Sequence, residues 1–170
     1  ARGTSAAAGR ARGVVMNVGD ICNREVVFVN RDVTVHAACR LMRHYHVGSL
    51  VVVDTATDDP SPRVKHVPVG ILTDRDIVVE VDAMELDARV ITVGDIMSDD
   101  LVVAPESLSL AEAVDLMRFK GVRRLPVVNA DSRLSGIVTI DDVLVVLAEA
   151  LSNIAHVVSR EPRKEAIARR

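Results

Sequence analysis

The feature that most constrains this fold is an internal repeat. Residues 18–21 read VGDI, and the same four residues return at 93–96, 75 positions later. The same offset relates two identical LMR stretches, residues 41–43 and residues 116–118. A sequence that repeats at a fixed spacing encodes the same supersecondary unit more than once. We therefore predict two copies of one small unit.

A second pair of related stretches shows where the two copies differ. Residues 70–76 read GILTDRD and residues 136–142 read GIVTIDD, which are 66 positions apart. Because the offset falls from 75 to 66, the first copy carries nine additional residues ahead of this stretch. They lie in a segment rich in Pro, Asp and Ser, which is the composition of a surface loop. We predict a loop insertion at about residues 55–68.

The hydrophobic pattern alternates between helical and extended spacing within each copy. Ser109 and Glu112 form a capping-box signature ahead of a helical stripe, and Thr34 holds the corresponding position in the first copy. Short apolar runs follow, and their β-branched content favours buried strands. A second helix is predicted over about residues 74–84 and again over about residues 140–158. Each copy thus reads β-α-β-β-α, an α+β fold built from α/β-type units.

Three short strands with helices on one face leave the other face of the sheet uncovered. We therefore expect the two copies to pack about a pseudo-twofold axis as one unit. The first copy is assigned to residues 16–86 and the second to residues 91–150. Residues 1–15 contain Ala, Gly and Arg but no acid, so we expect a flexible lead-in.

Residues 151–170 form a C-terminal helix extension with a basic tail. From residue 144 onward, apolar residues recur at helical spacing, which favours packing against a second copy of the chain. They are Leu147, Leu151, Ile154 and Val158. Pro162 is expected to break or restart the helix, because proline lacks a backbone donor. The tail receives no functional assignment.

Each GI(L/V)T stretch ends in a Thr with an Asp three positions later. A helix N-terminus has free N–H groups and the positive end of the helix dipole, so it can hold an anion. A carboxylate one turn further can accept from two hydroxyls of a ribose-like ring. The same Thr-x-x-Asp corner also serves as a plain helix cap, worth about 1 kcal/mol without any ligand. Both interpretations stay open.

The composition argues against several classes of function. Aromatic residues make up only 2% of the chain and the net charge is −3, which disfavours a nucleic-acid partner. No apolar run approaches the roughly 20 residues that span a bilayer, and no secretory signal is recognisable. Two cysteines without CxxC spacing fit a reducing cytosol. We therefore expect a cytoplasmic protein that binds neither nucleic acid nor membrane.

No catalytic motif is recognisable in the sequence. It lacks GxSxG, HExxH and Walker A patterns. The two corner Asp residues belong to different copies, so they do not form an acid–base pair. We therefore expect that the chain is not an enzyme and carries no catalytic cofactor.

The ordered set of features resembles a tandem pair of cystathionine-β-synthase (CBS) domains. The resemblance covers residues 18–147 and rests on the VGDI openers, the capped helices, the VRRLPVV strand and the GI(L/V)T-x-x-D corners. It implies one Bateman module of the stand-alone bacterial type. Such modules have two clefts for adenosyl compounds such as AMP, ADP, ATP, NAD or S-adenosylmethionine, and they form homodimers through helical faces. Nucleotide occupancy would then be passed to an unidentified effector protein.

The resemblance also implies site residues for one cleft. Thr139 would contact phosphate and Asp142 the ribose hydroxyls, while Arg123 and Arg124 would add positive charge for the phosphate. Apolar edges of the opposite copy, Val27 and Val47, would enclose the adenine.

For the other cleft, the corresponding residues are Thr73 and Asp76, with Arg75 in place of the arginine pair. The apolar edges would be Val102 and Val122. We expect the Thr139 cleft to bind more tightly, because the arginine pair lies beside it in the sequence.

Other interpretations of these residues remain. In one of them the clefts hold no ligand, and the corners are only caps in a structural or interaction dimer. Arg123 and Arg124 can equally be solvated charges, or pair with Asp141 and Asp142. Burial of one guanidinium in the cleft would favour phosphate contact.

A metal or thiol stress sensor is the remaining alternative. Four histidines (His36, His44, His46 and His66) occur without a recognised ligand spacing. Cys22 aligns with Met97, and Cys39 aligns with Val114. The repeat therefore favours both cysteines as small apolar fillers, and no metal site is assigned.

Overall fold

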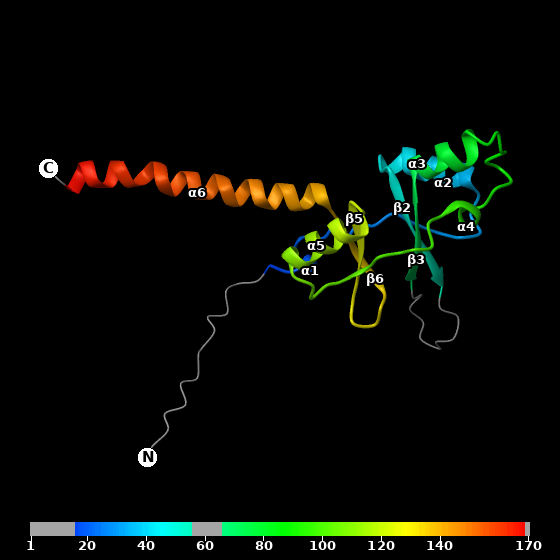
Figure 1. Cartoon of the computed structure of the whole chain (residues 1–170), viewed down its shortest axis with the longest axis horizontal. Helices are drawn as coiled ribbons and strands as arrows, with labels where there is room; N and C mark the ends of the chain where they lie inside the picture. Colours follow the sequence, from blue (N-terminus) through cyan, green and yellow to red (C-terminus); the bar gives the residue numbers. More distant parts are fainter. Residues whose placement is uncertain (1–15, 56–65, 169–170) are drawn as a thin grey trace, which may run out of the picture.

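The computed structural model of the chain describes residues 16–55 and 66–168, with side chains up to residue 158 (Figure 1). The expected lead-in (residues 1–15) and most of the expected loop insertion lie outside the described residues. The strands on either side of the insertion are longer than the apolar runs suggested, since they pair as far as Thr55 and His66.

Two three-stranded sheets form the body of the molecule (Figure 1). In the first sheet, β1 lies parallel to β2, and β2 lies antiparallel to β3. The second sheet repeats this arrangement with β4, β5 and β6. The strands are β1 Phe28–Asn30, β2 Ser49–Thr55, β3 His66–Thr73, β4 Ala104–Pro105, β5 Arg124–Val128 and β6 Leu134–Thr139.

One amphipathic helix connects the first two strands of each copy. These helices are α2 (Val35–Tyr45) and α5 (Leu110–Lys120). Each begins at its predicted cap: Thr34 accepts from the backbone of Ala37, and Ser109 forms a capping box with Glu112. The predicted β-α-β-β-α order and the α+β fold class are confirmed.

The second helix differs between the copies. In the first copy, α3 (Asp74–Ile77) passes into a π-helix, η1 (Val78–Asp82). In the second copy, α6 (Ile140–Ala168) extends away from the body (Figure 1). The expectation that Pro162 breaks or restarts this helix is wrong. An interior proline costs a helix about 3 kcal/mol, and Glu, Arg and Lys, which flank it, are good helix formers that favour continuing the helix.

Both faces of the first sheet are covered. Leu50 and Val52 of β2 lie in an apolar core on the helix side of the sheet. Val51 and Val53 point to the opposite face because side chains alternate along a strand, and they are also buried. Strands β3 and β6 contact each other across the two copies. The sheets therefore cover one another as expected.

The VGDI openers form one-turn helices, and each packs on the other copy. They are α1 (Val18–Ile21) and α4 (Val93–Ile96). Val18 is fully buried in the core of the second sheet, and Val93 in the core of the first. Figure 1 shows α1 beside α5, and α4 on the side of β2 and β3.

The backbone contacts of this exchange are reciprocal. The Val18 N–H donates to the Leu108 carbonyl at 2.8 Å, and the Val93 N–H donates to the Val33 carbonyl at 2.8 Å. The repeat offset of 75 converts the first pair of residues into the second. Each copy thus completes its core with the opener of the other, and this exchange was not predicted.

Candidate ligand pockets

The Thr139 corner joins β6 to α6 as a complete capping box. Asp142 Oδ2 accepts from the Thr139 backbone N–H at 2.8 Å and from Thr139 Oγ1 at 2.7 Å. The Asp142 backbone N–H donates back to Thr139 Oγ1 at 3.3 Å. Among the described residues, no hydrogen bond ends on Asp142 Oδ1. That oxygen can therefore accept from a bound hydroxyl.

The Thr73 corner repeats this geometry between β3 and α3. Asp76 Oδ2 accepts from the Thr73 backbone N–H at 2.8 Å and from Thr73 Oγ1 at 2.7 Å. The Asp76 N–H donates to Thr73 Oγ1 at 3.2 Å. Both corners are thus satisfied as caps without any ligand.

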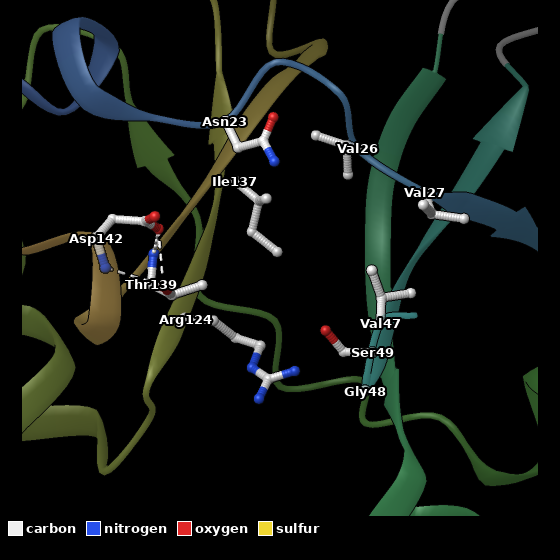
Figure 2. Close-up of a pocket in the computed structure, with 10 residues that line it drawn as sticks. All are labelled: Asn23, Val26, Val27, Val47, Gly48, Ser49, Arg124, Ile137, Thr139 and Asp142. Carbon is white, nitrogen blue, oxygen red and sulfur yellow. Dashed lines mark hydrogen bonds between the residues drawn. The ribbon is translucent and has the colours of Figure 1, made fainter. Parts of the chain in front are cut away.

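A cavity of about 240 Å³, the Thr139 pocket, lies between the two copies. Figure 2 shows Thr139 and Asp142 on one side and Val27 and Val47 across from them, with Arg124 extending into the gap. These are five residues that the sequence assigned to one cleft. The lining is completed by Asn23, Val26, Gly48, Ser49 and Ile137.

A larger cavity of about 360 Å³, the Thr73 pocket, contains the other corner. Predicted residues that line it are Thr73, Arg75, Val102 and Val122. Asp76 is not among its lining residues, although it makes the same hydrogen bonds to Thr73 that Asp142 makes to Thr139. The remaining lining residues are Ile71, Asp74, Ser98, Asp100, Leu101, Gly121, Arg123, Arg124 and Pro126.

The two neighbouring arginines take different positions. Arg124 is half-buried and lines both pockets. Arg123 lines only the Thr73 pocket, and its exposed side chain lies 4.0 Å from the Asp141 carboxylate. The expected placement of both arginines at the Thr139 corner is therefore corrected. Only Arg124, the first residue of β5, reaches the Thr139 pocket, while both arginines line the Thr73 pocket.

Sequence reasoning missed one polar residue in each pocket. Asn23 lines the Thr139 pocket, and Ser98 lines the Thr73 pocket. Each lies two residues after an exchanged opener, and the repeat offset of 75 relates them. Their shared position in the repeat was the available signal.

The two cysteines are partly buried, and Cys22 packs against the apolar core of the second sheet. Cys22 and Cys39 are half-buried and free. Burial raises the pKa of both thiols, which disfavours the reactive thiolate. His66 packs against Phe28 with ring centroids 4.3 Å apart. Within the described part of the chain, no three His, Cys, Asp or Glu residues are grouped so as to hold a metal ion.

Comparison with known families matches this duplicated architecture. The CBS domain model matches residues 18–83 and again residues 93–149. Each match contains one of the two sheets. The chain belongs to the CBS domain family. CBS domains are regulatory modules and not an enzyme family, and this chain is a tandem pair of them.

Relatives of the tandem CBS pair include an uncharacterized protein of Methanopyrus kandleri, 34% identical over 76% of this chain. The match spans 61% of that protein, so this chain covers less than two thirds of it. The CBS domain-containing protein YhcV of Bacillus subtilis is 33% identical over 82% of this chain and 96% of YhcV.

Two solved structures are also similar to the CBS pair. Hypoxic Response Protein I, crystallised with two coordinated zinc ions, is 34% identical with a TM-score of 0.61, over 76% of this chain and 97% of that one. The cytosolic domain of the Mg²⁺ channel MgtE in complex with ATP is 31% identical with a TM-score of 0.59, over 77% of this chain and 48% of that one.

Nothing in the described helices suggests a membrane span. None of them combines the length and the apolar character needed to cross a bilayer.

Proposed function

We propose that this CBS pair binds an adenine nucleotide of the AMP, ADP, ATP or NAD class and transmits its occupancy as a regulatory signal. The observation that carries the proposal is convergence in one cavity. Thr139, Asp142 and Arg124 come from one copy, and Val27 and Val47 come from the other. No single copy contains this set.

Each part of a nucleotide has a partner in the Thr139 pocket. The free Oδ1 of Asp142 accepts from the ribose hydroxyls, and Thr139 lies at the N-terminus of α6, where the helix dipole favours phosphate. The Arg124 guanidinium adds a charge-assisted hydrogen bond to phosphate. The two valines supply an apolar slot for the adenine.

The Thr73 pocket is the weaker site in this proposal. It has a stronger positive contribution from Arg75, Arg123 and Arg124, but Asp74 and Asp100 oppose it. Asp142 lines the Thr139 pocket, whereas Asp76 does not line the Thr73 pocket. The ranking therefore rests on the available carboxylate, and no longer on the number of arginines.

The size of the Thr139 pocket suggests how binding becomes a signal. Small-molecule pockets usually measure about 300–1,000 Å³, whereas this one measures about 240 Å³. In this proposal a nucleotide that binds there widens the gap between the copies. Ligand affinity then differs between the narrow and the wide state, and this difference drives the rearrangement.

The rearrangement is passed to an effector protein in the cytoplasm through a homodimer. The similarity to MgtE, whose cytosolic domain was crystallised with ATP, supports the ligand class. Membrane and nucleic acid have no part in this function.

Calorimetry tests the proposal with AMP, ADP, ATP, NAD and S-adenosylmethionine on protein stripped of bound nucleotide. Asp142→Ala is expected to remove the tighter site. Glu112→Ala is the matched control, because it breaks a similar capping box in a residue that lines neither pocket. No heat and no shift in melting temperature at millimolar ligand would refute the proposal.

One observation favours a second candidate, a ligand-free interaction module. Both corners are complete capping boxes, so they have a structural role already. In that case Thr139→Ala lowers stability by about 1 kcal/mol and leaves every nucleotide titration unchanged. Under the nucleotide proposal the same variant also weakens binding.

A further inference from the structure

Helix α6 carries an apolar stripe beyond the body of the molecule. Leu144, Leu147, Leu151, Ile154 and Val158 are between 50% and 67% exposed. Figure 1 shows that most of the helix extends away from both sheets. Helices in proteins gain most of their stability from packing an apolar face against a neighbour. The stripe therefore needs an occupant.

The spacing of the stripe identifies that occupant as another helix. Starting at Leu144, the apolar residues follow one another at intervals of 3, 4, 3 and 4. This 3.5-residue repeat is the a/d pattern of a coiled coil, and it continues for four turns of α6. The flanking positions nearest the middle are Ala148 and Ala150. Such small residues let two helix backbones approach closely.

The charge distribution along α6 favours a second copy in antiparallel orientation. Residues 140–149 contain Asp141, Asp142 and Glu149 and no basic residue, whereas residues 160–164 contain three basic residues and one acid. Antiparallel helices bring the basic end of each copy to the acidic end of the other, and their dipoles also oppose. Asp141 is 78% exposed at the acidic end. A parallel pair would align like charges.

The body offers a matching surface where the stripe begins. An open apolar groove of about 410 Å³ lies between α5 and α6, lined by Val114, Met117, Ile140 and Leu144 among others. In an antiparallel pair with Leu147 of one copy opposite Leu151 of the other, Val158 of the partner lies level with Ile140. The far end of one stripe therefore meets the groove of the other copy.

We propose that the exposed stripe of α6, from Leu144 to Val158, joins two copies of this chain as an antiparallel helix pair. Leu147 of one copy packs against Leu151 of the other, and the twofold axis passes between Ala148 and Ala150. The inference rests on the homodimer of the proposed function and not on nucleotide binding. Failure of this interface therefore leaves the calorimetric test of the pockets unaffected.

A matched pair of substitutions tests the interface in the full chain. Leu151→Asp places a charge in the stripe, whereas Ser152→Asp places the same charge on the adjacent outer face. Leu151 is 67% exposed, so its replacement is expected to leave the melting of the body unchanged. Sedimentation should show the assembly mass falling twofold for Leu151→Asp and staying at the wild-type value for Ser152→Asp. A monomeric wild type, or equal masses for both variants, would overturn the proposal.

Disulfide trapping tests the orientation. A mixture of Leu147→Cys and Leu151→Cys chains should give a cross-linked heterodimer, because these positions face one another only in the antiparallel pair. Each variant alone should remain uncross-linked, as should the wild type with its Cys22 and Cys39 under the same oxidation. Efficient cross-linking of each variant with itself would indicate a parallel pair and contradict the orientation.

Discussion

The sulfur of Cys22 lies against Gly136, so close that a Cβ on this glycine would come within 2.6 Å of it. The other copy shows the same relationship, because a Cβ on Gly70 would come within 2.6 Å of the Met97 sulfur. In both cases the exchanged opener crosses the first residue of a GI(L/V)T stretch. The glycine that begins the ligand corner is therefore required by the opener of the other copy.

Gly136→Ala is expected to destabilise the protein by about 1–3 kcal/mol, the usual cost of overpacking. Besides the Cys22 sulfur, the added methyl would meet the Asn23 carbonyl at 3.0 Å, and backbone cannot easily move away. Urea unfolding measures the change. The double variant with Cys22→Ala should recover part of the loss. A change below about 0.5 kcal/mol, the range of ordinary surface substitutions, would contradict this packing role.

The residues that end α2 and α5 predict two substitutions that change the free energy of unfolding in opposite directions. His46 and Gly121 occupy the same repeat position, with φ of 54° and 67°. A side chain in this left-handed region costs about 1–2 kcal/mol, whereas glycine adopts it freely. His46→Gly should therefore stabilise by up to about 1 kcal/mol, after the entropy of glycine in the unfolded chain is deducted. Gly121→Ala should destabilise by about 1 kcal/mol, although a Cβ there meets nothing within 4 Å. Thermal unfolding tests both, and two changes of the same sign would be inconsistent with the strain argument.

Arg124 and Arg123 should affect nucleotide binding differently. Arg124→Ala is expected to weaken both sites about 10- to 100-fold, the loss of one charge-assisted hydrogen bond to phosphate at each. Arg123→Ala should weaken only the Thr73 pocket, which it lines. Arg118→Ala is a suitable control, because Arg118 is 81% exposed and lines neither nucleotide pocket. Two-site calorimetric titrations measure these effects, and equal losses for Arg123→Ala at both sites would contradict the placement.

The thiols should react slowly with alkylating reagents. Burial raises the pKa of Cys22 and of Cys39, so at any pH near 8 a smaller fraction is thiolate than in a free cysteine peptide. The pH at which the alkylation rate reaches half its maximum is therefore expected to be higher for the protein than for the peptide. A midpoint at or below the peptide value would favour a thiol sensor instead.

Much of the local structure follows from the sequence because its causes are local. Ser109 and Glu112 cap α5 as their spacing predicts, and the GI(L/V)T stretches end in the expected Thr–Asp corners. Val27 and Val47 were placed in the Thr139 pocket by family resemblance, and the structure brings them there. The prediction depended on the positions of these valines in the repeat and not on the chemistry of their side chains.

The sequence by itself determined the duplication, the order of helices and strands, the caps and the two corners, since each depends on residues a few positions apart. Only the tertiary structure decided which sheet each opener covers. A four-residue helix such as α1 could pack its apolar residues on either core, and the path of the chain places it on the second. It also decided that Arg124 lines both pockets while Arg123 lines only the Thr73 pocket, because this depends on how the two copies pack around each side chain. Neither relationship has a local pattern that a sequence could display.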